Sequence, residues 1–323
     1  MSQTFATWNN SELNSFLVEI TVEVLKKVDG ETGRPLVEMV LDKAGQKGTG
    51  KWTSQAALDL GVPIPTIDSA VSMRQISAQK DVRLLVAQKF GSQTPFINEK
   101  LHQGETVTSE PLHDAKAMRA AAAFETTVSQ HHAENIDEQA EIHLSQSVEN
   151  PSDENKNTEL REASKENIDL FVEELKNALL ASFIVTYAQG MSLLQTASIE
   201  KSYGLNLSEI AKIWRGGCII RSALLEEMRR AYAENPQLPN LVLDNQFAQM
   251  LNDNREDWRA VVDKFTDSRV PVLCLSSALN YFDAFRSEQL PANLIQAQRD
   301  FFGAHTYQRT DKEGIFHTPD WNK

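Results

Sequence analysis

A short glycine-rich run in the first third of the chain has the residue types that bind small anions. Residues 47–51 read Lys-Gly-Thr-Gly-Lys, so a lysine stands on each side of two glycines. Glycine leaves backbone N–H groups open to close approach because it has no Cβ, and lysine adds positive charge. The run therefore suggests a site for a phosphorylated or carboxylated small molecule. A plain turn between helices would use the same residues, and the run alone leaves both interpretations open.

A second group of candidate anion donors lies near the C-terminus. Arg299 and His305 flank a Phe-Phe-Gly step, which places an aromatic anchor between them. Taken alone, His305 is more often a structural residue. Arg299, like Arg74 further upstream, is more often a surface or ion-paired residue. Together with residues 47–51, however, the group favours one binding site, for which the rest of the chain is the scaffold.

The sequence argues against several other kinds of chemistry. Residues 45–52 resemble a phosphate-binding P-loop until the last position, where Trp52 replaces the Ser or Thr that holds magnesium, and they follow a helix-like segment instead of a strand. No G-x-G-x-x-G fingerprint of a dinucleotide-binding domain occurs, and no Ser/His/Asp nucleophile pattern is evident. His131, His132 and His143 lack metal-ligand spacing, so we predict no metal site.

Composition narrows the class of partner and the compartment. The net charge of −13 argues against broad binding to nucleic acid or anionic membranes, so an anionic substrate needs a local basic pocket. Cys218 and Cys274 lie in apolar surroundings without metal-ligand spacing, which is typical of reduced core thiols. Neither a secretion signal nor an apolar run of membrane-spanning length is evident. We predict a soluble cytoplasmic protein.

The elements that must position these residues are helices. Only 14 glycines and 11 prolines occur in 323 residues, apolar side chains recur at helical spacing, and no segment alternates convincingly as a strand does. We expect an all-α fold, with Arg74 on a helix over about 67–89 and a long buried helix from Ile168. The expected parts are helical residues 1–90, a polar, disordered insertion over 91–165, helical residues 166–290, and a C-terminal tail over 291–323.

Six blocks of the sequence carry a family resemblance. They are Ser15–Thr21, Asp42–Thr53, Ala57–Pro63, Tyr187–Gly190, Trp214–Ser222 and Leu290–Tyr307. In this order the blocks resemble the C-terminal helical domain of the decarboxylating 6-phosphogluconate dehydrogenases. The similarity covers nearly the whole chain except residues 91–165, where members of the family have a much shorter connection.

The resemblance implies roles for the candidate residues. In this family a Lys-Gly-Thr loop and an Arg of the following helix hold the phosphate and hydroxyls of the substrate, and these map onto Lys47, Thr49 and Arg74. An Arg and a His from the tail of the partner subunit complete the pocket, and these map onto Arg299 and His305. The implied ligand is 6-phosphogluconate, and the implied assembly is a homodimer whose tails complete the sites.

The family reaction also needs parts that the six blocks do not contain. Its enzymes begin with a Rossmann domain for NADP and a helix that carries a catalytic Lys and Glu, and we expect both to be absent from this chain. The reaction oxidises 6-phosphogluconate and releases carbon dioxide to give ribulose 5-phosphate in the pentose phosphate pathway. We therefore expect the substrate-binding and dimerisation half of such an oxidoreductase, inactive alone. The alternative is a non-catalytic dimeric sugar-phosphate-binding or scaffold protein.

Overall fold

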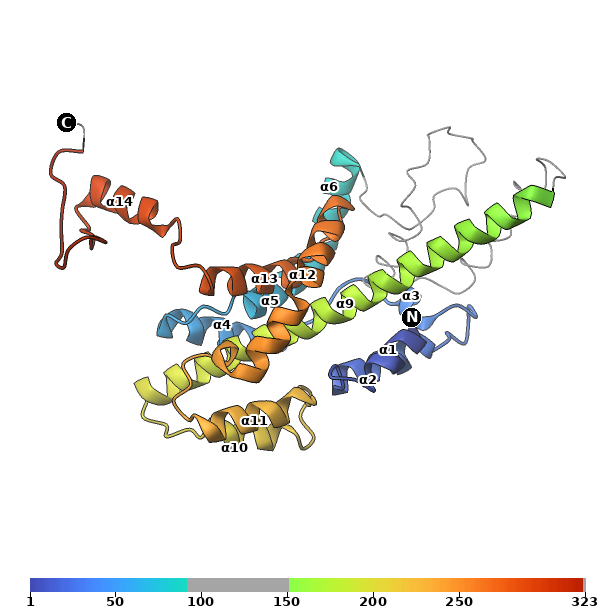
Figure 1. Cartoon of the computed structure of the whole chain (residues 1–323), viewed down its shortest axis with the longest axis horizontal. Coiled ribbons are helices and arrows are strands. Elements are labelled where there is room, and N and C mark those ends of the chain that lie inside the picture. The colour runs from blue at the N-terminus through green and yellow to red at the C-terminus, as the bar shows by residue number, and fades with distance from the viewer. Residues whose placement is uncertain (92–150, 322–323) are drawn as a thin grey trace. The chain divides into compact units, whose positions relative to one another are not determined.

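The computed structural model describes residues 1–91 and 151–321, and within these ranges every regular element is a helix (Figure 1). Extended pairing there is limited to three isolated bridges, Ser15–Ser222, Val28–Pro35 and Tyr307–Phe316. The predicted all-α class is therefore confirmed for the described residues. Most of the polar tract, including His131, His132 and His143, lies outside them, so the expectation of a disordered insertion stays a prediction.

The described helices fall into two sets, one before residue 92 and one after residue 150. Those before residue 92 are α1 (Ser2–Trp8), α2 (Phe16–Lys26), α3 (Leu36–Met39), α4 (Thr49–Leu60), α5 (Pro65–Ala78) and α6 (Lys80–Phe90). Those after residue 150 are α9 (Pro151–Glu200), α10 (Leu207–Trp214), α11 (Leu224–Glu234), the 3₁₀ turn η2 (Leu241–Leu243), α12 (Asn245–Asp267), α13 (Leu273–Phe285) and α14 (Ala292–Gly303). The single helix expected over 67–89 is two helices, α5 and α6, which meet at Gln79 (φ −87°, ψ 46°).

Side chains at the helix ends explain several of these boundaries. The Ser15 hydroxyl accepts the Val18 N–H at 3.2 Å and begins α2. The Asp244 carboxylate accepts the first free N–H groups of α12 in the same way. Such caps satisfy backbone donors that have no partner inside the helix. Helix α4 ends at Gly61, whose φ of 65° is a left-handed conformation that glycine adopts without strain.

Helix α9 carries the core of the larger unit, and α12 packs along it. Phe171 of α9 meets Phe265 of α12 edge-on, with ring centroids 6.0 Å apart. Phe247 and Trp258 of α12 are fully buried, as are Ile184 and several neighbours on α9. Apolar burial is the main favourable contribution to folding, so this helix pair is the centre of the core. The shorter helices α4, α5 and α10 pack against α9.

The turn between α4 and α5 is fixed to α9 by apolar and polar contacts. Ala57, Ile64 and Leu193 form a buried cluster there. Beside it, Gln189 has no exposed surface, accepts the Thr66 N–H at 3.0 Å, and donates to the Thr66 hydroxyl at 2.8 Å. A buried amide is tolerated only when its polar atoms are hydrogen-bonded. Gln189 therefore fixes where α5 begins, and with it the position of Arg74.

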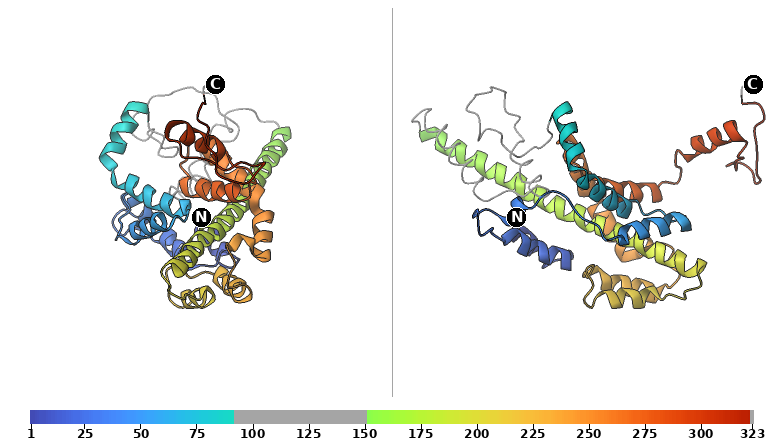
Figure 2. Two further views of the ribbon diagram at one scale, coloured as in Figure 1. Left: turned by 90° about the vertical axis from the view of Figure 1, so that its left-hand side faces the viewer. Right: turned by 180° about the vertical axis from the view of Figure 1, so that it is seen from behind.

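The segment before α11 connects the N-terminal helices to α9. The Phe16 N–H donates to the Arg221 carbonyl at 2.9 Å, and the Tyr187 hydroxyl of α9 donates to the Ile220 carbonyl at 2.5 Å. Burial raises the pKa of Tyr187 to about 12, so its hydroxyl stays protonated as a donor at neutral pH. Helices α10 and α11 pack against each other and lie side by side at the bottom of both views in Figure 2.

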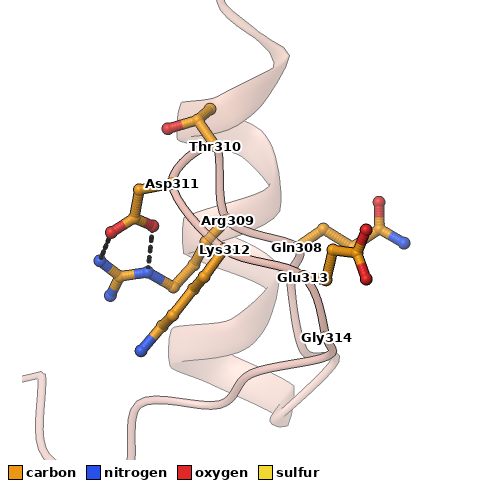
Figure 3. A pocket seen from close by; sticks show the side chains of 7 residues that line it. All are labelled: Gln308, Arg309, Thr310, Asp311, Lys312, Glu313 and Gly314. Carbon is orange, nitrogen blue, oxygen red and sulfur yellow. Dashed lines mark hydrogen bonds and ion pairs between the residues drawn. The ribbon is translucent and has the colours of Figure 1, made fainter.

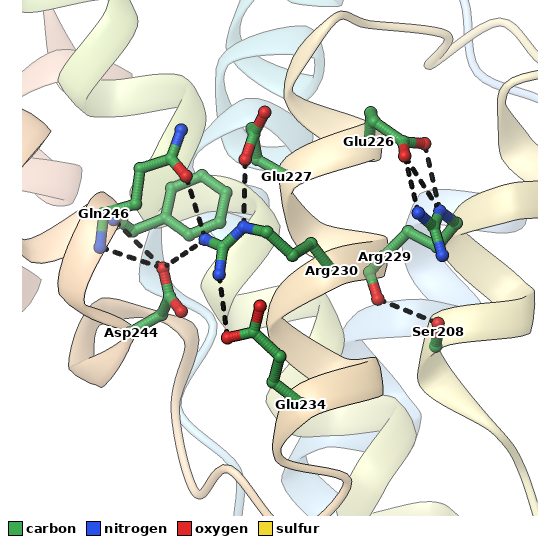
Figure 4. A network of polar contacts seen from close by, with 9 residues as sticks. Ser208, Glu226, Glu227, Arg229, Arg230, Glu234, Asp244 and Gln246 are labelled. Atoms are coloured by element: carbon green, nitrogen blue, oxygen red, sulfur yellow. Dashed lines mark hydrogen bonds and ion pairs between the residues drawn. The ribbon is translucent and has the colours of Figure 1, made fainter.

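A single arginine joins α11 to the beginning of α12. Arg230 contacts Glu227 at 3.1 Å, Glu234 at 3.0 Å and Asp244 at 3.1 Å, and the carboxylates surround its guanidinium (Figure 4). Isolated surface ion pairs contribute little, but a shared guanidinium with several acceptors fixes geometry. Since every acceptor comes from the chain itself, this cluster is structural and is no candidate for ligand binding.

The chain divides into two compact units, Met1–Leu279 and Asn280–Lys323. The smaller unit contains α14 and a return segment in which Tyr307 and Phe316 exchange backbone hydrogen bonds of 2.8 Å. Among the described residues, no helix combines the length and the apolar character needed to cross a membrane.

Candidate functional site

The glycine-rich run forms the N-terminus of α4. Gly48 occupies the N-cap position with a left-handed φ of 98°, and no side chain caps this end of the helix. The first intrahelical bond runs from the Trp52 N–H to the Gly48 carbonyl at 3.0 Å. The N–H groups of residues 49–51, in the first turn of α4, therefore have no acceptor within the helix. This is the local geometry that the anion-site interpretation of the run requires.

Arg74 lies across this first turn. A Cβ built on Gly50 would come within 2.7 Å of an Arg74 Nη atom and 2.9 Å of the Val71 Cγ2. The Arg74 guanidinium can approach so closely only because residue 50 has no side chain. Its Nε donates to the Ala70 carbonyl at 3.3 Å, which directs the terminal nitrogens toward α4. The structure thus brings Arg74 next to the turn that Thr49 begins.

The charge around this turn is positive although the chain as a whole is acidic. Within residues 1–91 and 166–321, no carboxylate forms an ion pair with Lys47, Lys51 or Arg74, whereas most other arginines there have one. Lys47, Thr49 and Lys51 are exposed, and Arg74 is half-buried. An anion would therefore meet cationic groups that no side chain neutralises.

The chain before the run is anchored to α5 and α6. Asp42 pairs with Arg83 at 2.9 Å and with Lys80 at 2.7 Å, and the Ala44 N–H donates to the Ser77 hydroxyl at 2.9 Å. Hydrogen bonds from Arg83 and Lys80 lower the pKa of Asp42 to about 2. These contacts hold the entry to the loop, so the position of Lys47 does not depend on the glycines alone.

Arg299 and His305 lie together in the smaller unit. Arg299 is exposed on α14, and its Nη1 contacts the Gln296 Oε1 at 3.4 Å. The His305 ring lies against Gly303, where a built Cβ would be 2.7 Å from Nε2, and it meets Phe302 edge-on at 5.8 Å between centroids. The five predicted residues thus fall into two groups, Lys47, Thr49 and Arg74 in the larger unit and Arg299 and His305 in the smaller one.

Asp300, next to Arg299, is the centre of the smaller unit. It has no exposed surface, and its carboxylate contacts the Thr306 N–H, the His317 Nδ1, the Thr318 N–H and the Trp321 Nε1 at 2.9 to 3.1 Å. Burial alone would raise the pKa of Asp300, but the hydrogen bonds outweigh it and lower the pKa to about 2. Asp300 is therefore an ionised structural carboxylate at neutral pH.

Comparison with known proteins decides the family. The family model described as "6-phosphogluconate dehydrogenase, C-terminal domain" matches residues 1–149 and 115–321. The chain belongs to this family. The 6-phosphogluconate dehydrogenase resemblance of the six sequence blocks is thereby confirmed, and the two matched segments overlap within the polar tract.

Individual 6-phosphogluconate dehydrogenases resemble the chain along its whole length. The NADP(+)-dependent, decarboxylating enzyme of Bacillus subtilis is 41% identical over 323 residues, which are 100% of this chain and 55% of the relative. The decarboxylating enzyme of Escherichia coli is 40% identical, with coverage of 98% and 53%. A Plasmodium falciparum 6-phosphogluconate dehydrogenase structure matches with a TM-score of 0.74 and 36% identity, over 98% of this chain and 54% of that one. The chain thus spans about half the length of these relatives.

The smaller unit also has a hollow, which contains none of the five predicted site residues. It is lined by Gln308–Gly314. The guanidinium of its Arg309 already forms two hydrogen bonds of 2.7 Å with Asp311 (Figure 3). The Lys312 Nζ lies 4.8 Å from the centroid of the Phe316 ring. The Arg309 guanidinium is therefore neutralised by Asp311, whereas no carboxylate of the described residues pairs with Arg74 or Arg299.

Proposed function

We propose that this chain forms the substrate-binding and dimerisation part of a decarboxylating 6-phosphogluconate dehydrogenase. The observation that supports this most strongly is the position of Arg74 across the first turn of α4. There the Arg74 guanidinium, which has no carboxylate partner among the described residues, lies against Gly50 in the first turn of α4, next to the backbone N–H groups of Thr49 and Gly50 and shortly after Lys47 in the chain. A doubly charged phosphate ester is the ligand that such a group of donors favours.

In this proposal each residue makes a different contact with 6-phosphogluconate. Arg74 offers two parallel hydrogen bonds, Lys47 a mobile point charge, and Thr49 a short neutral donor. Arg299 and His305 act on the substrate bound to the other subunit of a homodimer, an assignment that rests on the family resemblance of Leu290–Tyr307. Substrate binding would then depend on dimerisation.

The oxidation step requires a hydride acceptor, and by family that acceptor is NADP. The residues described here do not fit a dinucleotide: they contain no strand–turn–helix unit, and the sequence has no G-x-G-x-x-G pattern. The role of these residues is accordingly to hold the phosphate and orient the sugar acid. We propose that hydride transfer and acid–base catalysis use groups supplied by a cofactor-binding half, and that the assembly works in the cytoplasm.

Titration calorimetry with 6-phosphogluconate tests the binding proposal, with gluconate as the ligand that lacks the phosphate. The wild-type chain should bind the phosphorylated ligand and not gluconate. Arg74→Ala should weaken binding by about tenfold to a hundredfold, because the charge-assisted hydrogen bonds of its guanidinium are lost. Arg34→Ala is the matched control, because Arg34 pairs with Glu38 at 2.7 Å outside the cluster. Equal affinity of the wild type and Arg74→Ala would contradict the proposal.

An assay of NADP reduction distinguishes the two candidate functions, the substrate-binding half of an enzyme and a non-catalytic binding protein. The chain should give no rate with 6-phosphogluconate and NADP alone, and a rate after mixing with a separately expressed NADP-binding half from a relative. Binding without a rate in the mixture, although the added half is folded, would favour the dimeric sugar-phosphate-binding or scaffold protein. A rate from the chain alone would show that it contains the chemistry assigned here to other groups.

A further inference from the structure

Two polar side chains of α14, Gln296 and Asp300, hold the backbone of Thr306 at both of its polar groups. The Asp300 Oδ1 accepts the Thr306 N–H at 2.9 Å, and the Gln296 Nε2 donates to the Thr306 carbonyl at 2.6 Å. Residues four positions apart lie on one face of a helix, one turn apart. Thr306 is therefore fixed by two successive turns of α14.

This fixation acts on a strained turn. Ala304 and Thr306 have φ values of 50° and 62°, in the left-handed region that side chains other than glycine rarely adopt. His305 lies between them. Strained backbone persists where surrounding contacts over-determine it, and such positions cluster at functional sites. At this turn those contacts are the hydrogen bond that Gln296 donates to the Thr306 carbonyl and the one that Asp300 accepts from the Thr306 N–H.

The turn places the His305 ring on the same face of α14 as Arg299. The ring occupies the space that a side chain at Gly303 would take, since a built Cβ there would be 2.7 Å from its Nε2 and 2.8 Å from its Cδ2. Residues 299 and 303 are four positions apart and share a helix face. The imidazole therefore lies beside Gly303, one helical turn beyond Arg299.

Gln296 also contacts the other member of this pair. Its Oε1 lies 3.4 Å from the Arg299 Nη1, while its Nε2 holds Thr306. Asp300, in contrast, has both oxygens occupied, because His317, Thr318 and Trp321 use the remaining acceptor positions. Neither side chain is left to bind a ligand by itself, and both act through their neighbours.

We propose that Gln296 and Asp300 are positioning residues, which hold the turn 304–306 so that His305 and Arg299 present their donors to the same phosphorylated ligand. This inference rests on the proposed function, because it assigns that ligand to Arg299 and His305. The competing explanation is a purely structural one, in which Asp300 only keeps the smaller unit folded.

A double-mutant cycle on the full chain distinguishes the two. Asp300→Asn should raise the Kd for 6-phosphogluconate about tenfold or more. In that background His305→Ala should cost little further affinity, while Arg299→Ala should keep its full effect, since Arg299 stands on α14 itself. Gln296→Met should give the same pattern, because it removes the donor to Thr306 without adding a charge beside Arg299. Loss of both effects together would mean that the tail unfolds and would overturn the proposal.

A second measurement, which does not depend on ligand binding, tests whether Asp300 holds the turn; the double-mutant cycle tests what the turn does for the ligand. The nuclear Overhauser contacts between the His305 ring and Gly303, and the slow hydrogen exchange of the Thr306 amide, should be present in the wild type and lost in Asp300→Asn. Asp311→Asn is the matched control, because that exposed carboxylate pairs with Arg309 in the same unit. If the wild type does not bind 6-phosphogluconate, the proposed function fails, and these signals still decide the inference: their persistence in Asp300→Asn would overturn it.

Discussion

A single methyl group added at Gly50 would disturb the candidate site. Alanine at this position should change stability little, because the roughly 1 kcal/mol by which alanine favours a helix over glycine is offset by the contact of the new Cβ with the Val71 Cγ2, 2.9 Å away. The new Cβ would displace the Arg74 guanidinium, so affinity for 6-phosphogluconate should fall about tenfold. Calorimetry and a thermal melt measure both quantities. Gly45→Ala is the control, since nothing lies within 4 Å of that position; equal affinities of the two variants would contradict the prediction.

At this scale the sequence and the structure contribute different information. The spacing of Lys47, Thr49 and their glycines, with the family resemblance, was enough to predict an anion site there. The approach of Arg74 to Gly50 was not predictable from spacing, because it depends on how the α4–α5 turn closes. Asp300 and Gln296 were missed because a carboxylate and an amide on an amphipathic helix usually face water, and only the tertiary return of residues 306–321 buries Asp300.

The element that positions Arg74 is α5, and its anchor to α9 is Gln189. Gln189→Leu should destabilise the larger unit by about 1–3 kcal/mol, because the buried Thr66 N–H and hydroxyl lose their partner. Urea unfolding followed by circular dichroism measures this as a lower midpoint at similar slope. Gln249→Leu, at an exposed position of α12, should leave the midpoint within about 0.5 kcal/mol of the wild type. An unchanged midpoint for Gln189→Leu would show that the amide does not fix α5.

The tail segment around α14 should be sensitive to acid. The pKa of Asp300 is lowered from 3.8 to about 2 in the fold, so its ionised form stabilises the segment fully above pH 4, and this contribution is lost as the pH falls toward 2. The Trp321 indole N–H and Thr306 amide signals in nitrogen-edited spectra should therefore change between pH 4 and pH 2. Asp300→Asn should show the changed signals already at neutral pH. Wild-type signals that stay constant down to pH 2 would contradict the assignment.

Helices with strong apolar periodicity were predictable, and those with weak signals were not. The long helix expected from Ile168 follows from its apolar spacing and is present within α9, which begins at Pro151. The break at Gln79 has neither glycine nor proline to mark it, so α5 and α6 were predicted as one helix. Helix α14 was expected only as part of the C-terminal tail over 291–323.

For the molecule as a whole, the all-α class followed from sparse glycine and proline, and the family followed from six ordered blocks. A separate tail over 291–323 was predicted, but the beginning of the smaller unit at Asn280 was not, because that boundary reflects which residues are buried together. In the described residues, the buried apolar side chains all precede residue 282, and beyond it Asp300 is the buried side chain. The smaller unit is accordingly organised around a polar centre and the larger one around an apolar core.

This division predicts how the chain responds when its tail is removed. A chain ending at Phe285 retains the buried apolar side chains, so it should unfold cooperatively and keep its helical circular dichroism. If the tails join two subunits as proposed, the Tm of the full chain should rise with protein concentration, whereas that of the truncated chain should not. The truncated chain should also bind 6-phosphogluconate as weakly as the Arg299→Ala, His305→Ala double variant. A concentration-independent Tm for the full chain, or tighter binding by the truncated chain, would show that the tail does not complete a site in a partner.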